Sequence, residues 1–203
     1  MLKKIPMSGI ILAGGKSSRM GQDKAFLPFG KGTMLESQAR LMDSIFEETL
    51  IIVNEKMNCE RLDLGNAVVY VDIFKNHGPL AGLYTALAYS KCAASCVMPC
   101  DMPFVDAALL WDLADSAEEE YDALCFEDAK GRWQPFPGLY FRSVRHLIRL
   151  LLDRGELSMQ RFLQVAVIKP LVLEKEKSKV WMNMNTMDDY HQVLREKNGL
   201  GRE

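Results

Sequence analysis

The segment from Gly9 to Lys24 constrains the fold more than any other part of the chain, because an apolar strand runs directly into a glycine-rich loop. Residues 10–12, Ile-Ile-Leu, form the short apolar run that is typical of a buried parallel strand. Residues 13–15, Ala-Gly-Gly, remove large side chains where the chain leaves the sheet, so backbone N–H groups can approach an anionic ligand. The segment therefore predicts a strand followed by an anion-binding loop.

Three cations, Lys16, Arg19 and Lys24, follow in the same loop, and Gly21 lies between them. Arginine can bind a phosphate through two hydrogen bonds, and lysine acts on it as a point charge. Cations on a loop beside a strand end predict a site for a polyphosphate.

Two familiar phosphate-binding motifs do not fit this loop. Gly9 and Gly14 have the spacing of a Walker loop, but Gly15 stands where that loop requires lysine. The dinucleotide fingerprint Gly-x-Gly-x-x-Gly also fails, because Lys16 stands two places after Gly14. We therefore expect neither a P-loop NTPase nor an ordinary dinucleotide-binding dehydrogenase.

Apolar strand-like runs alternate with helical patterns along most of the chain, which predicts an α/β fold with a mostly parallel sheet and helices on both faces. Strands are expected at Gly9–Leu12, Leu50–Val53, Val68–Val71, Cys96–Met98 and Ala123–Phe126. Helices are expected at Met34–Ile45, Leu80–Tyr89, Val105–Leu113 and Val144–Leu152, and a last helix is expected after a capping box formed by Thr186 and Asp189. With 203 residues, the chain is long enough for one well-buried domain, and we expect residues 1–203 to form it.

Polar residues follow several of the expected strands. Asn54 follows the second strand, Asp72 the third and Asp101 the fourth, while the glycine loop follows the first. Each residue alone could serve a turn. Ligands of open α/β sheets bind beyond the carboxyl ends of the strands, so these residues are predicted to meet at one edge.

Composition narrows the possible partners. The chain has 25 basic and 27 acidic residues and a formal charge of −2, which argues against non-specific binding of nucleic acid. No apolar run approaches membrane-spanning length, and the N-terminus lacks a long apolar segment with a cleavage site. We expect a cytoplasmic protein that binds neither nucleic acid nor membrane.

The glycine loop, read as Leu12-Ala-Gly-Gly-Lys-Ser-Ser-Arg-Met-Gly-Gln-Asp-Lys24, resembles the signature of nucleotidyltransferases that attach a nucleotide to a phosphorylated acceptor. The resemblance is strongest to the molybdenum cofactor guanylyltransferases. Two further blocks, Gly78–Gly82 and Pro99–Pro103, resemble that family, and Gln134–Tyr140 and Asn183–Thr186 do so more weakly. The resemblance covers essentially the whole chain and implies a Rossmann-like nucleotidyltransferase domain.

The resemblance implies that GMP is transferred from GTP to the phosphate of the molybdopterin cofactor, with release of pyrophosphate. It implies Mg²⁺ as cofactor, GTP and molybdopterin as ligands, and cofactor-delivery proteins or molybdoenzymes as further partners. It assigns nucleotide contacts to Leu12, Ala13, Gly14, Lys24, Asn54, Asp72 and Asp101, and we expect Gly15 of the same glycine loop to join them.

Catalysis is expected to depend on Arg19 and Lys24, which would neutralise the nucleotide's phosphates, and on Asp101. Asp101 is the expected metal ligand because Mg²⁺ prefers carboxylate oxygens, commonly one or two from the protein. The ordinary alternative for Asp101 is a cap on the helix expected near Val105. The acceptor side is expected to include Gly78, Gly82, Asn183 and Asn185.

Other functions remain open at this stage. Within the class, the alternatives are a cytidylyltransferase acting on the same cofactor and a sugar-phosphate nucleotidyltransferase. Resemblance weighs against the cytidylyltransferases, which usually show Ala-Ala-Gly where residues 13–15 are Ala-Gly-Gly. A nucleotide-binding regulator without turnover is the alternative from another class. Such a protein would not need Arg19, Lys24 and Asp101 together.

Overall fold

The structure is a computed structural model that describes residues 3–14, 24–55, 61–128, 130–172 and 179–200. Gly15, Lys16 and Arg19, which belong to the expected phosphate-binding loop, lie outside these residues.

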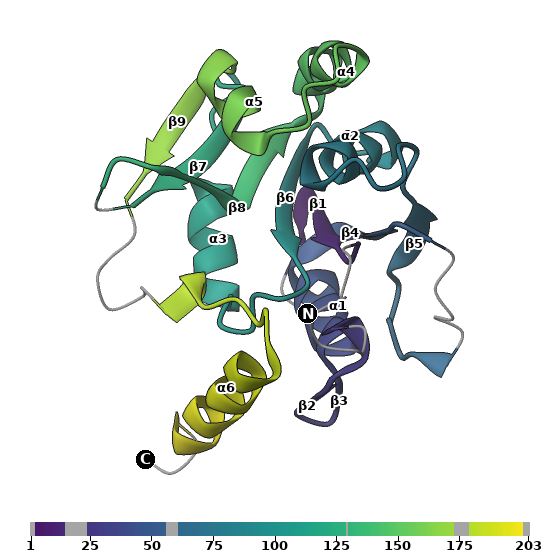
Figure 1. Ribbon diagram of the computed structural model, residues 1–203, viewed down its shortest axis with the longest axis vertical. Helices are drawn as coiled ribbons and strands as arrows, with labels where there is room; N and C mark the ends of the chain where they lie inside the picture. The colour runs from purple at the N-terminus through teal and green to yellow at the C-terminus, as the bar shows by residue number, and fades with distance from the viewer. Residues whose placement is uncertain (1–2, 15–23, 56–60, 129, 173–178, 201–203) are drawn as a thin grey trace.

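A seven-stranded sheet forms the centre of the fold, in the order β5-β4-β1-β6-β8-β7-β9 (Figure 1). The strands are β1 Ile5–Leu12, β4 Phe46–Val53, β5 Val68–Val71, β6 Ala94–Pro99, β7 Ala123–Glu127, β8 Trp133–Phe141 and β9 Ile168–Leu171. Strands β5, β4, β1 and β6 are parallel neighbours. Strand β8 is antiparallel to β6 and β7, and β9 pairs with β7 in parallel. The predicted mostly parallel sheet is confirmed.

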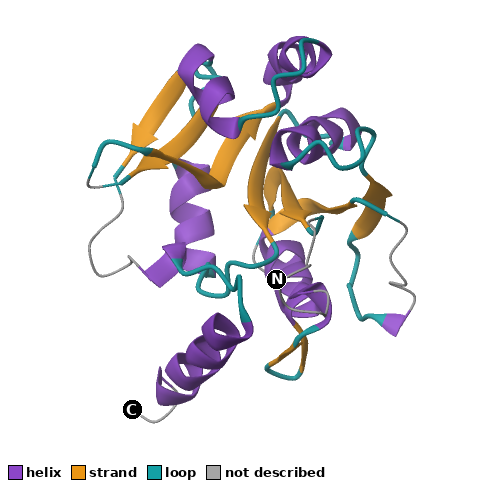
Figure 2. Ribbon diagram, in the orientation of Figure 1, coloured by secondary structure: helices purple, strands orange, loops and turns teal. Residues whose placement is uncertain are grey.

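Helices cover both faces of this sheet (Figure 2). Helices α1 Met34–Ile45 and α3 Ala107–Asp115 pack on one face, and α2 Pro79–Tyr89, α4 Arg145–Asp153 and α5 Met159–Val165 pack on the other. Alternate residues of each central strand enter the two cores: Ile11 belongs to the first, whereas Ile10 and Leu12 belong to the second. Burial on both faces explains the unbroken apolar run of β1.

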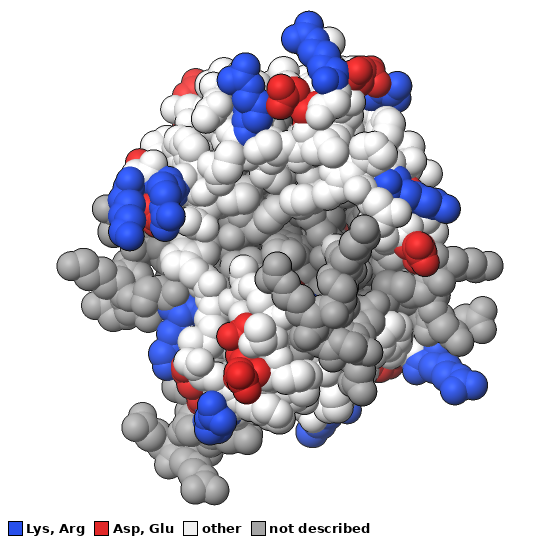
Figure 3. Space-filling model, in the orientation of Figure 1, with Lys and Arg blue, Asp and Glu red and all other residues white. Residues whose placement is uncertain are grey.

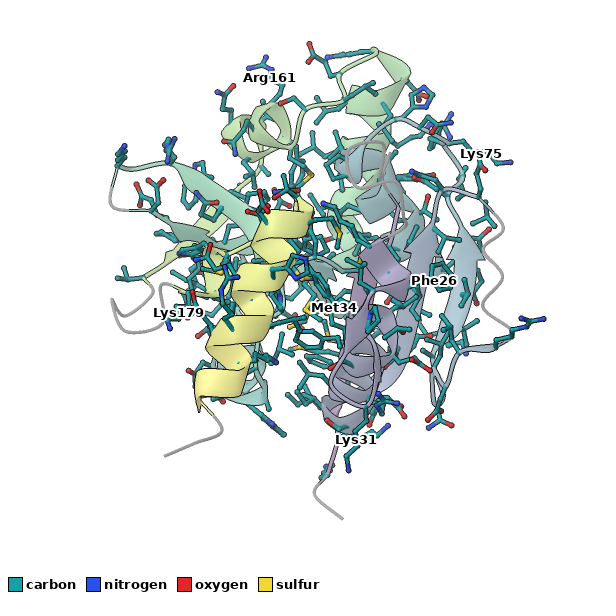
Figure 4. The ribbon with its side chains drawn as sticks, turned by 60° about the horizontal axis from the view of Figure 1, so that its bottom comes forward. Phe26, Lys31, Met34, Lys75, Arg161 and Lys179 are labelled. Atoms are coloured by element: carbon teal, nitrogen blue, oxygen red, sulfur yellow. The ribbon has the colours of Figure 1, made fainter. Side chains whose placement is uncertain are left out.

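A third, smaller core joins two distant parts of the chain. After the turn η1 Lys24–Phe26, the hairpin of β2 Pro28–Phe29 and β3 Gly32–Thr33 begins, and residues 27, 29 and 34 in and beside this hairpin pack against the C-terminal helix α6 Met187–Leu200. This core consists of Leu27, Phe29, Met34, Met184, Tyr190 and Val193. Figure 4 shows Met34 between the purple N-terminal segment and the yellow α6. The Tyr190 hydroxyl donates a hydrogen bond to the Pro28 carbonyl at 2.7 Å, which fixes α6 to the hairpin.

The expected elements are present close to their predicted positions. Helix α1 begins and ends at the predicted residues, and β1 and β4 extend further toward their N-terminal ends than predicted. The capping box of the last helix is confirmed, because the Asp189 N–H donates to the Thr186 hydroxyl while the Thr186 N–H donates to the Asp189 carboxylate. The sequence analysis missed β8, β9, α5 and the β2–β3 hairpin.

The block Gln134–Tyr140 lies within β8. Pro135 and Pro137 occur there because this part of β8 bulges: Cys125 pairs with Gly138, and the next residue of β7 pairs with Gln134. A proline cannot donate a ladder hydrogen bond, so it is tolerated where the pairing is interrupted.

Among the helices of the described residues, none combines the length and the apolar character needed to cross a membrane.

Candidate active site

The predicted meeting of strand exits is confirmed. Leu12 of β1 lies level with Ile52 of β4 and Pro99 of β6, so the neighbouring parallel strands end at one edge. The strand order reverses direction beside β1, because β4 and β5 lie on one side of it and β6 on the other. Such a reversal opens a crevice between the loops that leave the strands, and ligands bind there.

A cavity of about 620 Å³ occupies this edge, which is within the size range of small-ligand sites. It is lined by Leu12, Gly14, Ile52, Asn54, Asp72, Asn76, Gly78, Pro79, Gly82, Pro99, Asp101, Pro135, Phe136, Met159 and Asn183. Figure 3 shows the face hollowed near its centre, with most charged side chains toward the rim. The cavity brings together eight of the residues that the sequence analysis assigned to nucleotide or acceptor: Leu12, Gly14, Asn54, Asp72, Gly78, Gly82, Asp101 and Asn183.

Gly14 and Asn54 are packed against each other at the exit of β1. A Cβ atom on residue 14 would lie 2.9 Å from the Asn54 Cγ, so a larger residue would displace the asparagine. The chain is fixed just before this point, because the Ala13 N–H donates to the Ile52 carbonyl at 2.8 Å. The absence of a side chain on Gly14 therefore leaves the Asn54 amide in its place at the cavity.

Asp72 is a buried carboxylate in the wall of the cavity, with 4 % of its surface exposed. Its Oδ1 accepts hydrogen bonds from the Thr85 hydroxyl at 2.6 Å and the Phe74 N–H at 3.0 Å. Burial raises the pKa of Asp72 above its usual value, even though these hydrogen bonds favour the charged form. Its position beside helix α2 places a desolvated hydrogen-bond acceptor within reach of a bound ligand.

The first turn of α2 forms the adjacent wall. Gly78 precedes the helix with φ of 78°, a backbone conformation that favours glycine. A Cβ on Gly82 would lie 3.4 Å from the Leu12 side chain, so its small size lets α2 pack closely on the end of β1. The helix N-terminus therefore faces the cavity, where its positive dipole end favours anions.

Lys24, Asp101 and Asn185 form a polar cluster at the edge of the cavity. The Lys24 ammonium lies 3.1 Å from the Asp101 Oδ2 and donates to the Asn185 Oδ1 at 2.8 Å. The side chains of Lys24 and Asp101 are 17 % and 19 % exposed. These residues come from three separate regions of the chain, and the sequence analysis had assigned all three to the site.

Three hydrogen bonds hold the loop that carries Asp101. The Cys100 N–H donates to the Leu12 carbonyl at 3.0 Å, and the Met184 N–H donates to the Asp101 carbonyl at 3.0 Å. The Gln38 amide donates to the Met102 carbonyl at 3.2 Å. Helix α3 is capped by Asp106, whose Oδ1 accepts from the Leu109 N–H, so the alternative role of Asp101 as a helix cap is wrong.

The sequence analysis missed part of the cavity wall. Pro135 and Phe136 come from the bulge of β8, Met159 from α5, and Asn76 from the turn before α2. The weak resemblance of the Gln134–Tyr140 block was a signal for the first two. No signal marked Met159, because α5 itself was not predicted.

The residues present fit a metal that binds together with phosphates. In the described part of the chain, no group of three or more His, Cys, Asp or Glu side chains is placed to hold a metal ion. Magnesium is commonly held by one or two carboxylates together with substrate phosphates, so a partly exposed Asp101 beside a cavity suits it.

A mostly parallel sheet with this cavity at its strand ends defines an open α/β protein that binds its ligand beyond the carboxyl ends of the strands. The family model described as the MobA-like NTP transferase domain matches residues 9–170, and the chain belongs to this family. The protein is thus a nucleotidyltransferase.

Individual relatives agree with this membership. A Bacillus mycoides protein named "Probable molybdenum cofactor guanylyltransferase" is 31 % identical over 193 residues, which cover 93 % of this chain and 96 % of that protein. The crystal structure of molybdopterin-guanine dinucleotide biosynthesis protein A from Archaeoglobus fulgidus has the same fold, with a TM-score of 0.81 and 21 % sequence identity. The match covers 95 % of this chain and 100 % of that chain. A Mycobacterium tuberculosis protein crystallised in complex with manganese also shares the fold, with a TM-score of 0.67 and 21 % identity over 95 % of this chain and 100 % of that one.

The raised pKa of Asp72 predicts a pH-dependent effect of Asp72→Asn on stability. A carboxyl whose folded-state pKa exceeds its unfolded value stabilises the fold most at low pH, and this contribution is lost as pH rises through the folded pKa. Asparagine does not ionise, so the Asp72→Asn variant does not lose this stability as the pH rises. Its side-chain oxygen can still accept a hydrogen bond from the Thr85 hydroxyl. We expect its free energy of unfolding, relative to the wild type, to rise between pH 4 and pH 7 in urea titrations. Asp115→Asn, on an exposed residue of α3, is the control, and an equal trend in both variants would contradict the prediction.

Proposed function

We propose that this nucleotidyltransferase transfers GMP from GTP to the phosphate of molybdopterin, giving the guanine dinucleotide form of the cofactor and pyrophosphate. Residues 1–203 would act as a single domain, in the cytoplasm, with Mg²⁺ as cofactor. Molybdoenzymes or cofactor-delivery proteins would receive the product. The observation that carries the proposal is the Lys24–Asp101 pair at the edge of a nucleotide-sized cavity, in a chain whose relatives bear the guanylyltransferase name.

The chemistry is an in-line displacement at the α-phosphorus of the nucleotide. An oxygen of the acceptor phosphate forms the new P–O bond, and the bond from the α-phosphorus to the bridging oxygen of the β-phosphate breaks. Since a phosphate monoester carries negative charge near neutral pH, the attacking oxygen needs no general base. The main task of the protein is to orient two anions and to neutralise their charge.

The residues of the site divide this task. The start of α2 would offer its positive dipole end to the phosphates, and we propose that N–H groups of the glycine loop bind them as well. Lys24 would supply a point charge to the reacting phosphates. Asp101 would hold Mg²⁺, which when bound with the nucleotide neutralises and orients its phosphates. Asp72 would accept hydrogen bonds from the nucleoside, since its carboxylate faces the cavity from beside α2.

The acceptor would lie toward the wall formed by Phe136, Met159 and Asn183. This wall offers an apolar surface and an aromatic ring for a flat heterocycle, and an amide that can both donate and accept hydrogen bonds. Asn185 lies beside the Lys24–Asp101 pair, because its oxygen accepts a hydrogen bond from Lys24. We therefore propose that Asn183 contacts the acceptor, and that Asn185 acts where the two substrates meet.

One assay tests the function directly. The full chain is incubated with molybdopterin and Mg²⁺, and with GTP or CTP in parallel, and pyrophosphate and the dinucleotide product are measured. Product formation with GTP and molybdopterin is expected. Preference for CTP would identify a cytidylyltransferase. Turnover only with sugar phosphates as acceptors would identify a sugar-phosphate nucleotidyltransferase, and nucleotide binding without product would identify a regulator.

Asp101→Asn is expected to reduce kcat/KM by about 10²-fold or more, because the amide keeps the shape of the side chain but loses the charge that holds the metal. Pyrophosphate release measures the loss, and circular dichroism checks the fold. Asp106→Asn removes the same charge nearby and keeps the oxygen that caps α3, so it should retain wild-type turnover. Near-normal turnover of Asp101→Asn would refute the assignment of Asp101 as the essential ligand.

Lys24→Ala is expected to reduce kcat/KM by about 10²-fold, which corresponds to about 3 kcal/mol of lost transition-state stabilisation. Lys31 provides the control, since it lies at the exposed turn of the β2–β3 hairpin (Figure 4) and Lys31→Ala removes an equal charge. Equal losses in the two variants would show that only the general charge of the region matters.

A further inference from the structure

The position of the Lys24 ammonium depends on a residue from the far end of the chain. Lys24 ends in two hydrogen bonds, one to Asp101 on the loop after β6 and one to Asn185 before α6. The bond to Asn185 is the shorter of the two, at 2.8 Å against 3.1 Å. Whatever fixes Asn185 therefore also fixes the direction in which the lysine points.

Asp189 fixes the backbone of Asn185. Its Oδ2 accepts from the Asn185 N–H at 2.9 Å and from the Thr186 N–H at 2.8 Å. The Asp189 N–H in turn donates to the Thr186 hydroxyl at 3.2 Å. A simple helix cap satisfies N–H groups within the first turn of its helix, whereas this carboxylate also holds the residue that contacts Lys24.

The Asp189 carboxylate is held mainly by hydrogen bonds. Hydrogen bonds from the Thr186 hydroxyl and from the two N–H groups hold the pKa of Asp189 below its usual value, and the positive charge of Lys24 contributes to the same shift. Hydrogen bonds are thus the main link of Asp189 to its neighbours, and they include the bond that holds Asn185.

The small core formed by the hairpin and α6 gives this linkage a rigid base. Leu27 and Met184, which are close in sequence to Lys24 and Asn185, are both buried in it. The Tyr190 hydroxyl ties α6 to Pro28, and the Met184 N–H bonds to the Asp101 carbonyl. The lysine, its asparagine partner and the aspartate loop are therefore anchored to one another.

We propose that Asp189 is a positioning residue that holds Asn185 so that the Lys24 ammonium points toward Asp101 and the reacting phosphates. Helix α6 thereby becomes part of the transferase site. The catalytic consequence rests on the proposed role of Lys24 in phosphate neutralisation, whereas the structural linkage can be tested without turnover.

The direct test is the reactivity of Lys24. The full-length protein, without nucleotide, is given a short pulse of acetic anhydride, and mass spectrometry compares acetylation of Lys24 with that of exposed Lys31. Asp189→Ala removes the acceptor of the Asn185 and Thr186 N–H groups. The resulting loss of the Lys24–Asn185 hydrogen bond is expected to raise Lys24 acetylation about fivefold. Asp188→Ala removes the same charge from an exposed neighbour in the same turn and should leave Lys24 acetylation unchanged.

Two internal controls separate positioning from helix stability and from charge. The Lys197 Nζ lies 4.4 Å from the centre of the Phe29 ring, so its acetylation reports whether α6 stays packed on the hairpin. Asp189→Asn retains an oxygen that can accept both N–H bonds, and we expect it to restore wild-type labelling of Lys24. Increased labelling of both Lys24 and Lys197 in Asp189→Ala would overturn the proposal, because Asp189 would then serve only to keep the helix in place. Unchanged Lys24 labelling, or an asparagine variant that behaves like alanine, would also overturn it.

Kinetics then test the link to catalysis. Asp189→Ala should lower kcat about tenfold with the KM for GTP changed less than about twofold, because a misplaced lysine mainly weakens charge neutralisation in the transition state. Asp189→Asn should restore kcat. If Lys24 labelling rises as expected while kcat stays at the wild-type value, the positioning role stands and the proposed catalytic role of Lys24 fails.

Discussion

Parallel pairing of β5, β4, β1 and β6 is the constraint on which the site depends. Leu12 of β1 pairs with Ile52 of β4 and with Pro99 of β6, so these three strands end at the same level. The loops that follow the strands are therefore brought close together. The change of direction beside β1 then leaves room for a ligand between the loops. Side chains from distant parts of the sequence meet there because backbone hydrogen bonds between the strands place them.

The two cavity carboxylates differ in environment, and this difference assigns them different tasks. Asp72 is nearly inaccessible and committed to the Thr85 hydroxyl, so it can offer a fixed acceptor but is poorly placed to exchange water with a hydrated metal. Asp101 is partly exposed and forms an ion pair with Lys24. Its charge is therefore balanced by the Lys24 ammonium, and a bound Mg²⁺ would also balance it. Asp101 thus depends on a cationic partner, whereas the buried Asp72 is held by hydrogen bonds.

The central fold and much of the candidate site could be predicted from the sequence, because their signals are local. The apolar run of residues 10–12, the glycines after it and the polar residues Asn54, Asp72 and Asp101 after later strands each mark a strand exit. The structure brings these exits together as expected. Strand β8 escaped prediction because its prolines signal a turn, and only the interrupted pairing with β7 explains how a strand can hold them. Strand β9 is short, and α5 spans only Met159–Val165, so neither presents a long periodic pattern.

The contact between Lys24 and Asn185 shows where sequence reasoning reaches its limit. Both residues were expected at the site, yet 161 positions separate them, and no local pattern indicates that their side chains bond. The contact depends on a small core whose residues come from the hairpin and from α6 and which neither segment could form alone. An exposed lysine side chain would sample many rotamers. Because Lys24 is held between Asp101 and Asn185, part of the conformational entropy of its side chain is already lost on folding. The C-terminal helix, which lies outside the sheet and its two large cores, therefore contributes to the site by restricting one side chain at the opposite end of the chain.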